Sequence, residues 1–228
     1  MSGVVTGEDG RARCPWAGGT PEYQAYHDVE WGHPVADENR VYELLCLEGF
    51  QAGLSWLTIL RKRPAFQDAF ASFDPVVVAR FGEPDVERLL GDAGIVRHRG
   101  KITAAITNAR ATLRLRETGR SLAEVVWSYE PRPHRPAAAM EDLEAVTPES
   151  KALSSELRRN GFAFVGPTTV YSAMQALGVV NDHLAGCDAR VAVDAERARF
   201  VRPSSSSHEA SVASTGGSLR QVRPRARK

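Results

Sequence analysis

The stretch that decides the fold is residues 148–178, which reads PESKALSSELRRN, then GFAFVGP, then TTVYSAMQALG. The pattern predicts a helix that starts with a cap at Thr147, a short turn, and a second helix through Leu177. Gly161 and Gly166 bound the turn, and glycine permits both a tight turn and the close approach of another backbone. We therefore expect two helices joined by a compact hairpin.

The second of these helices begins Pro167-Thr168, so its free backbone N–H groups would point out of the hairpin. A helix N-terminus with free N–H groups is an anion site. Helix–hairpin–helix elements hold the DNA backbone in this way, and they need no basic side chain to do so. The alternative is an ordinary joint between two helices, in which Phe162 and Phe164 pack into the core.

Helical periodicity extends over the rest of the chain between Cys14 and Phe200. The predicted helices cover residues 38–47, 55–61, 64–70, 83–90, 98–116, 122–129, 147–159 and 168–177, with a further helix that starts at Asp74-Pro75. No segment alternates apolar and polar residues as a half-buried strand does. We expect an all-α domain over residues 13–200. A disordered N-terminus (residues 1–12) and a disordered, Ser-rich basic tail (residues 201–228) would flank it.

The composition is that of a globular chain. Of the 228 residues 43% are hydrophobic and 25% are charged. No apolar stretch approaches the ~20 residues that a membrane span needs, and the first residues have no apolar core of signal-peptide length. Three cysteines do not make a disulfide framework, which favours a reducing cytoplasm.

Charge is distributed unevenly along the chain. Residues 201–228 carry six basic residues against Glu209, a net charge of +5, so the other residues carry −4 of the total of +1. Nucleic-acid binding by such a body must come from a local patch, or from the tail by non-specific attraction. One candidate patch is residues 97–101 (RHRGK) at the start of a long predicted helix, and the alternative is a solvated basic turn.

Four residues near the two ends of the predicted domain have the composition of a zinc site. Twelve residues separate Cys14 from His27, and His183 and Cys187 are four apart, which places them on one face if that segment is helical. Two imidazoles and two thiolates make the closed tetrahedral shell of a structural zinc. Spacing alone leaves chance pairing and ordinary buried cysteines open. A shared metal would tie the start of the domain to its end.

A second candidate site combines aromatic side chains with one carboxylate. The aromatic residues are Trp16, Tyr23, Tyr26, Trp31 and Trp56. Glu48 ends an apolar helix, and the helix dipole disfavours an anion there, which suggests a function for it. Aromatic faces with one carboxylate suit a planar cation through stacking and cation–π attraction. The alternative is that the aromatic residues are core and that Glu48 is a cap.

Several longer motifs carry a family resemblance. In chain order they are residues 14–16 (CPW), 26–32 (YHDVEWG), 47–56 (LEGFQAGLSW), 94–102 (GIVRHRGKI), 161–166 (GFAFVG), 171–176 (YSAMQA) and 180–183 (VNDH). Over about residues 14–187 the chain resembles the bacterial 3-methyladenine DNA glycosylase I family. The resemblance implies an all-α fold of the helix–hairpin–helix DNA glycosylase superfamily, with a zinc site that joins the N- and C-terminal parts of the domain.

The resemblance also implies roles for single residues. Cys14, His27, His183 and Cys187 match the ligands of one structural Zn²⁺. Glu48 matches the acidic residue that contacts the damaged base, and it is our candidate catalytic residue. Tyr26 and Trp56 match aromatic residues that hold the base, with Trp16 and Tyr23 as further candidates. Together with the basic cluster, the predicted DNA contacts are Gly161, Phe164, Gly166, Thr168, Arg97, Arg99, Lys101 and Leu54. Of these, Leu54 would fill the gap that the damaged base leaves.

The implied activity is that of a DNA repair enzyme that excises 3-methyladenine by hydrolysing its N-glycosidic bond. Flipping the base out of the duplex costs about a few kcal/mol. N3-methylation makes the base cationic and a good leaving group, so Glu48 would position the base rather than protonate it. No lysine lies in the hairpin, so a Schiff base is not indicated, and we expect no lyase activity. We expect a monomer in the bacterial cytoplasm, associated with the nucleoid through double-stranded DNA that contains alkylated bases.

Three features depart from the family or stay ambiguous. Phe50 stands where Gln is usual, which would alter packing or DNA contacts. Many superfamily members use an Asp after the hairpin to stabilise the sugar cation, and Asp182 is the acid near that place. Its alternative role is helix capping or support of the neighbouring His183. The basic tail lies outside the family pattern, and we expect it to add only non-specific affinity.

Other functions stay open at this point. A helical module could bind methylated or abasic DNA without chemistry. A zinc scaffold could bind a protein partner, and it would show no salt-dependent affinity for DNA. A glycosylase could also prefer another alkylated base such as 3-methylguanine, because one group in a pocket is worth only about a few kcal/mol.

Overall fold

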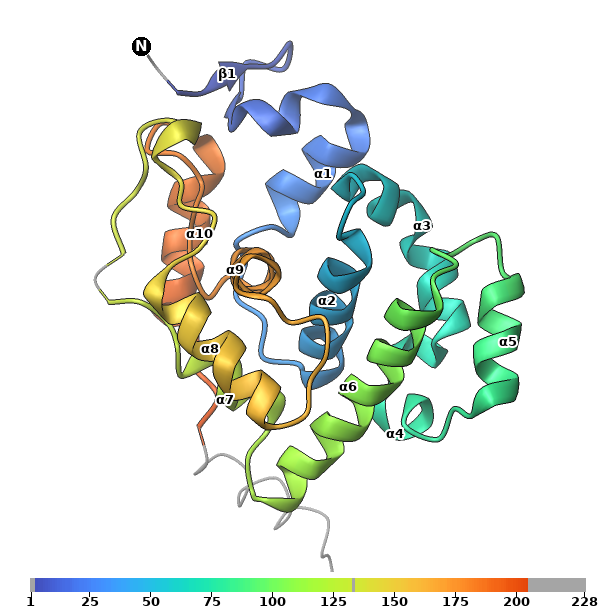
Figure 1. The fold of residues 1–228 in the computed structure, drawn as a ribbon. Coiled ribbons are helices and arrows are strands. Elements are labelled where there is room, and N and C mark those ends of the chain that lie inside the picture. Colours follow the sequence, from blue (N-terminus) through green and yellow to red (C-terminus); the bar gives the residue numbers. More distant parts are fainter. Residues whose placement is uncertain (1–2, 133, 205–228) are drawn as a thin grey trace, which may run out of the picture.

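The computed structural model describes residues 3–132 and 134–204, and over these residues the protein is mostly helical (Figure 1). The α-helices are α1 (Pro21–Val29), α2 (Glu38–Gln51), α3 (Trp56–Ala69), α4 (Pro75–Val78), α5 (Glu83–Gly91), α6 (Arg99–Glu117), α7 (Leu122–Trp127), α8 (Pro148–Arg159), α9 (Pro167–Ala176) and α10 (Asp188–Arg199). The short 3-10 helices are η1 (Pro15–Gly19), η2 (Ala71–Phe73) and η3 (Met140–Asp142), and the strands are β1 (Val5–Thr6) and β2 (Ala12–Arg13). The predicted all-α class is confirmed.

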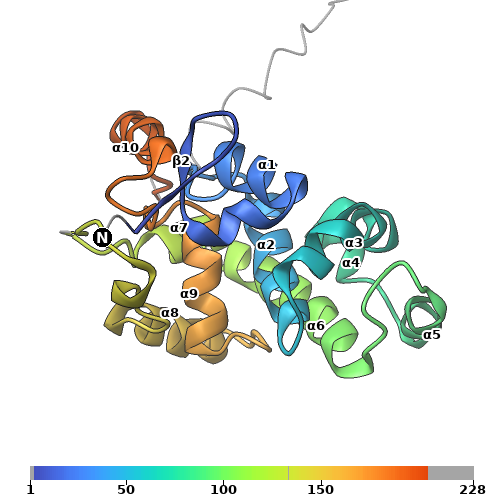
Figure 2. The same cartoon turned by 90° about the horizontal axis from the view of Figure 1, so that it is seen from above.

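Helix α2 lies at the centre of the fold. It begins at the predicted cap Asp37, whose Oδ1 accepts a hydrogen bond of 2.8 Å from the backbone N–H of Arg40. All ten residues from Val41 to Phe50 are buried. The helix contacts α3, α6, α7 and α9, and Figure 2 shows α3, α4 and α5 on one side of it and α8, α9 and α10 on the other. A helix buried on every face needs neighbours all round, and these four helices supply them.

Helices α8 and α9 form the predicted pair around the hairpin. Thr147 caps α8, because its hydroxyl accepts from the N–H of Ser150 (3.2 Å) while the Ser150 hydroxyl accepts from the N–H of Thr147 (3.0 Å). In the hairpin Gly161 has a φ of +85°. No side chain caps the first turn of α9, which starts at Pro167 after Gly166. The geometry expected for a backbone anion site is therefore present.

The prediction of a helix break at Pro64 is wrong. Helix α3 runs without interruption from Trp56 to Ala69 with Pro64 inside it. Pro64 lies on the exposed side, so water can satisfy the backbone carbonyl that loses its partner. Ile59 and Phe66 are buried on the other side, one before and one after the proline, and their packing keeps the two halves in line.

The end of the domain differs from the sequence-based expectation. His183 lies in a loop and Cys187 is the residue that precedes α10, so the two do not share a helix face. Helix α10 itself was not predicted, because it is rich in charged residues and buries only Ala189, Arg190 and Val193.

The N-terminus also differs from the expected disordered segment. Val5–Thr6 pairs antiparallel with Ala12–Arg13. The guanidinium of Arg13 donates to the carboxylates of Asp9 and Asp28, which fastens this small hairpin to α1. The predicted tail lies outside the described residues from position 205 on. Within the described residues, no helix combines the length and the apolar character needed to cross a bilayer.

Gly178, just after α9, supports a test of the fold. Its φ is +67°, and a Cβ there would lie 2.5 Å from the carbonyl oxygens of Gly32 and His33. We expect Gly178→Ala to lower the free energy of unfolding by about 3 kcal/mol or more, because backbone atoms cannot yield to the new methyl group. Gly119, with a φ of +79° and no atom within 4 Å of its Cβ position, is the matched control. Gly119→Ala should cost only about 1 kcal/mol. Equal losses in urea unfolding would contradict this account.

Candidate active site and metal cluster

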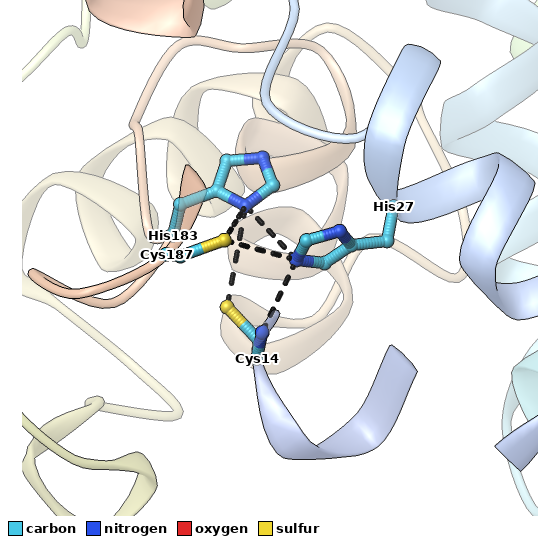
Figure 3. A group of neighbouring side chains, drawn as sticks. All are labelled: Cys14, His27, His183 and Cys187. Atoms are coloured by element: carbon cyan, nitrogen blue, oxygen red, sulfur yellow. Dashed lines mark hydrogen bonds between the residues drawn. The ribbon is translucent and has the colours of Figure 1, made fainter. Parts of the chain in front are cut away.

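The four predicted metal ligands come together in one buried cluster. The ligand atoms of Cys14, His27, His183 and Cys187 all lie within 4.8 Å of one another (Figure 3). The inner nitrogens of the two histidines are 3.1 Å apart, and Cys187 Sγ lies 3.4 Å from His27 Nε2 and 3.5 Å from His183 Nδ1. Two nitrogens and two sulfurs around a tetrahedral metal would be separated by about 3.3–3.8 Å. The cluster can therefore hold one metal ion.

The hydrogen bonds around the cluster set both imidazoles for metal binding. His27 Nδ1 lies 2.8 Å from Asp28 Oδ1, and His183 Nε2 lies 3.0 Å from the carbonyl oxygen of Trp31. Because a carbonyl or carboxylate only accepts, each histidine donates its proton outwards and turns a lone pair inwards. Two facing lone pairs repel unless a cation lies between them. Such outer partners orient the ligands of metal sites.

The two thiols complete the donor set. A hydrogen bond between the thiols raises the pKa of Cys14 and lowers the pKa of Cys187, so without a metal the pair would share one proton. A bound metal releases such protons, since the thiolate is the form that coordinates. Both cysteines are buried, as a closed structural site requires.

A pocket of about 280 Å³ lies at the C-terminal end of α2. Its lining is Trp16, Tyr23, Tyr26, Trp31, Glu48, Gln51, Trp56, Met140, Leu143, Ser172 and Gln175. These side chains come from η1, α1, α2, α3, η3 and α9 and from the segments that follow α1 and η3. All five residues predicted for the base site are present, so the structure brings together the aromatic side chains and the carboxylate.

Among the described residues that line this pocket, Glu48 is the only one with a carboxylate, and it is 6% exposed. No hydrogen bond reaches its carboxyl group from any described residue. Burial alone raises the pKa of Glu48 to about 8. Burial, followed by the charge of Glu48, also holds the pKa of Tyr26 well above its usual range. Burial thus favours the uncharged form of the Glu48 carboxyl group more than exposure to water would, in a pocket whose lining includes five aromatic side chains.

The aromatic wall is continuous with the metal cluster. The ring of Trp16 meets those of Tyr23, His27 and Trp31 edge-on, with centroids 5.7, 5.2 and 5.0 Å away. Trp31 in turn meets His183 at 4.8 Å. The hydroxyl of Tyr23 accepts a hydrogen bond of 3.0 Å from the first turn of α3. The two histidines of the cluster therefore pack directly behind tryptophan side chains that line the pocket.

Asp182 is buried and lies outside the lining of this pocket, and it lines a separate cavity together with His134 and Tyr171. Its carboxylate accepts from the hydroxyl of Tyr171 (2.8 Å) and from the side chain of Gln175 (2.7 Å), and it lies 2.9 Å from His134 Nε2. Burial opposes ionisation, but these three partners hold its pKa below the usual range. None of these bonds caps a helix or reaches a metal ligand, so the proposed alternative roles are not what the structure shows. Asp182 instead orients Gln175, which does line the pocket.

Phe50 has no contact with the pocket. It is 1% exposed and packs against Phe66 and Phe70, with ring centroids 4.6 and 5.8 Å away. Its departure from the family pattern therefore changes the core. Gln51, the next residue, occupies the pocket wall.

The predicted DNA contacts in the hairpin lie at the surface. Thr168 is exposed in the first turn of α9. Phe164 is 43% exposed and has a φ of +56°, a backbone conformation that bulky residues rarely adopt. Its Cβ lies 3.4 Å from the position a Cβ would take on Gly49, so the tip of the hairpin rests on α2. Leu54 is also exposed, at 42%, in the loop after α2.

The three cations of the basic cluster have different environments. Arg97 is exposed at the surface. Arg99 is exposed but forms ion pairs with Glu83 and Glu87 of α5. Lys101 is only 9% exposed, and its ammonium donates to backbone carbonyls at the end of α2. The structure therefore leaves Arg97 as the member of the cluster that is best placed to meet a phosphate.

Several pocket residues were not predicted as site residues from the sequence. Trp31 stood among the aromatic candidates, and Ser172 and Gln175 lie in the YSAMQA motif, whose polar positions are the signal that could have singled them out. Met140 and Leu143 come from a Pro- and Ala-rich connection without any pattern. Near the hairpin, the guanidinium of the exposed Arg158 lies 3.8 Å from the Cβ position of Gly166, which makes it a further cation at the predicted phosphate site.

Comparison with known proteins gives a consistent picture. The family model described as methyladenine glycosylase matches residues 16–191. The DNA-3-methyladenine glycosylase 1 of Escherichia coli (strain K12) is 50% identical over 179 residues, which cover 77% of this chain and 95% of that protein. A crystal structure of 3-methyladenine DNA glycosylase I is similar with a TM-score of 0.75 and 50% identity, over 77% of this chain and 98% of the other. A Staphylococcus aureus structure that addresses recognition of 3-methyladenine by the same enzyme has a TM-score of 0.74 and 36% identity, over 78% and 96% of the chains.

The raised pKa of Glu48 predicts how stability depends on pH. A carboxyl group with a pKa near 8 when folded and near 4.5 when unfolded stabilises the fold fully below about pH 4.5, and this contribution is lost as the pH rises through 8. Glu48→Gln keeps the shape of the group without its ionisation. The variant should therefore gain stability relative to the natural chain between pH 5.5 and 8.5, by about a few kcal/mol in denaturant unfolding. Parallel pH profiles would show that Glu48 is not desolvated.

Proposed function

The chain belongs to the methyladenine glycosylase family, and from this premise we propose that it is a DNA repair enzyme that excises 3-methyladenine from alkylated DNA. The observation that carries the proposal is the buried Glu48 carboxyl group, which has no hydrogen-bond partner among the described residues and faces an aromatic pocket. A buried polar group without a partner costs stability, so its place in the fold is best explained by a ligand that completes it.

Recognition of the damaged base would depend on charge. N3-methylation gives the base of the nucleotide a positive charge, and the flipped base would lie between the aromatic side chains that include Trp56 and Tyr26. Its charge would favour the ionised form of Glu48, which burial disfavours. A neutral base would meet a neutral acid and gain no such attraction. Burial of Glu48 would thus strengthen discrimination between methylated and normal bases.

The proposed reaction is hydrolysis. The bond between C1′ of the sugar and the base nitrogen breaks, its electron pair goes to the base and neutralises the charge, and a water oxygen binds C1′ and gives up a proton. Because the leaving group is already cationic, Glu48 holds the base and donates no proton to it. The pocket lining contains no lysine, which supports a monofunctional enzyme that forms no Schiff base with the sugar.

Contact with the duplex would use backbone groups and apolar side chains more than cations. The N-terminus of α9 and the hairpin would hold phosphates, with Arg97 nearby as a cation, while Leu54 would fill the gap in the base stack. Residues 1–200 carry a net charge of −4, which is consistent with a local DNA site. We further propose that the protein acts as a monomer in the bacterial cytoplasm.

The metal of the Cys₂His₂ cluster would be zinc in a structural role. The donor set and its spacing fit a tetrahedral zinc, and four protein ligands leave no position for water. When bound, the ion would supply charge that fixes the ligands in place. The ion would then join the start of the domain, at Cys14 and His27, to its end, at His183 and Cys187.

The decisive experiment measures release of free base from methylated duplex DNA. The natural chain should release 3-methyladenine and little 7-methylguanine. Glu48→Ala should lower the rate about 10- to 100-fold, because a charged hydrogen bond to the base is lost. Glu124→Gln alters another buried carboxylate, one that caps α7 away from the pocket, and it should retain the rate. Release that does not depend on Glu48 would disprove this assignment of the pocket.

The same preparations test the reaction type. Borohydride should trap no covalent complex with damaged DNA, and the sugar–phosphate strand should stay intact until the abasic site is cleaved by other means. A trapped complex would show lyase chemistry. Efficient release of 3-methylguanine would broaden the substrate class. No release, with tight binding to an abasic duplex, would indicate a binding module.

Zinc binding has its own test. Elemental analysis should find about one zinc per chain, and Cys187→Ser should lose it and melt at a lower temperature, because a structural zinc site contributes to folding free energy. Cys46→Ser is the matched control, since Cys46 is equally buried but lies outside the cluster. Zinc loss from both variants, or from neither, would rule out the proposed ligand set.

A further inference from the structure

Helix α6 carries two buried polar side chains that reach towards the two loops proposed to contact DNA. Lys101 and Asn108 are seven residues apart, about two helical turns, and so lie on one face. They are 9% and 2% exposed. A small cavity lined by both residues, together with Gly49 and Phe164, shows that this face is turned towards α2 and the hairpin.

Lys101 fixes the end of α2. Its Nζ donates to the carbonyl oxygens of Phe50 (2.9 Å) and Ala52 (2.6 Å). Helix ends leave such carbonyls without partners, and a cation there also complements the helix dipole. Gly53 and Leu54 follow directly. Lys101 therefore holds the point from which the exposed Leu54 leaves the helix.

Asn108 fixes the hairpin. Its Nδ2 donates to the carbonyl oxygen of Ala163 (3.1 Å), and its Oδ1 accepts from the N–H of the same residue (2.7 Å). Ala163 immediately precedes Phe164, whose backbone has the positive φ. An unfavourable backbone conformation persists only where its surroundings hold it. The paired bonds of Asn108 supply that constraint on the side that faces α6.

Neither side chain lines the base pocket. A helix that only had to pack against α2 could use apolar residues at both positions, because burying a polar group costs free energy unless it is fully hydrogen-bonded. Lys101 donates to two backbone carbonyls at the C-terminal end of α2. Asn108 makes two hydrogen bonds to the backbone of Ala163 in the hairpin and a further one to the thiol of Cys46 in α2. These hydrogen bonds therefore fix the positions of the Leu54 loop and of the hairpin.

We propose that Lys101 and Asn108 are positioning residues that hold the Leu54 loop and the hairpin at a fixed separation, so that both loops engage one damaged duplex together. The proposal rests on the proposed function as a DNA glycosylase. It makes DNA engagement dependent on α6, while recognition of the base by Glu48 and the aromatic wall is independent of it.

The test compares two binding reactions. Affinity for a duplex with a tetrahydrofuran abasic analogue reports on the loops, and quenching of tryptophan fluorescence by free 3-methyladenine reports on the pocket. Lys101→Met and Asn108→Leu should each weaken duplex binding at least about tenfold and change base binding less than about twofold. Arg110→Met is the matched control. Arg110 donates from the same helix to the carbonyls of Ala79 and Phe81, far from both loops in the sequence, and its loss should leave duplex binding within about twofold.

Double mutants identify the loop through which each residue acts. Leu54→Ala should have a smaller effect in the Lys101→Met background than in the natural chain, and its full effect in the Asn108→Leu background. Phe164→Ala should show the reverse pattern. If α6 had only a structural role, neither Leu54→Ala nor Phe164→Ala would depend on which α6 residue is changed.

The proposal would be overturned by parallel loss of base and duplex affinity, by an equal loss in Arg110→Met, or by additive effects in all the double mutants. If either apolar variant does not fold, Lys101→Gln and Asn108→Ser take its place, because they retain a shorter polar group. A natural chain that releases base but binds the abasic duplex no differently from Lys101→Met would also count against positioning. A natural chain that neither releases base nor binds the duplex removes the proposed function, and this inference falls with it.

Discussion

Burial of helix α2 along ten consecutive residues is the constraint on which the site depends. Helices on every side keep water from its surface, so the carboxyl group of Glu48 is desolvated and its pKa rises to about 8. The same packing places Gly49 beneath the tip of the hairpin and Gln51 in the pocket wall. One buried helix thus presents an acid to the pocket and, at the next residue, supports the hairpin that we propose contacts DNA.

The pocket and the metal cluster form one continuous structure. Trp16 and Trp31 contact histidines of the cluster and also line the pocket. The carbonyl of Trp31 also fixes the orientation of His183. A metal in this cluster would have two consequences: it would join the two ends of the domain, and it would hold rigid the rings against which a base would stack. Under the proposed function, stability and base recognition would therefore depend on the same contacts.

Surface charge plays a small part in the proposed contact with DNA. The folded part is net negative, Arg99 is engaged by acidic residues, and Lys101 is turned inwards. What the surface offers near α2 is backbone N–H groups at the start of α9 and two exposed apolar side chains, Leu54 and Phe164. Under the proposed function, such a surface would recognise the shape and deformation of a duplex rather than its charge density.

The sequence by itself determined the helical class and the helix–hairpin–helix pair, because periodicity, caps and long motifs are local signals. It also singled out the four residues that meet in the Cys₂His₂ cluster, and the carboxylate and four of the aromatic residues that line the pocket. It did not reveal the unbroken α3, the charge-rich α10 or the loop position of His183, since there packing outweighs local preference. Only the tertiary structure decided that Asp182 orients Gln175 and that Phe50 belongs to the core. It also decided that the ammonium of Lys101 binds the carbonyls at the C-terminal end of α2. These roles depend on which distant backbone or side chain completes a hydrogen bond or a packing contact, and residue spacing contains no record of that partner.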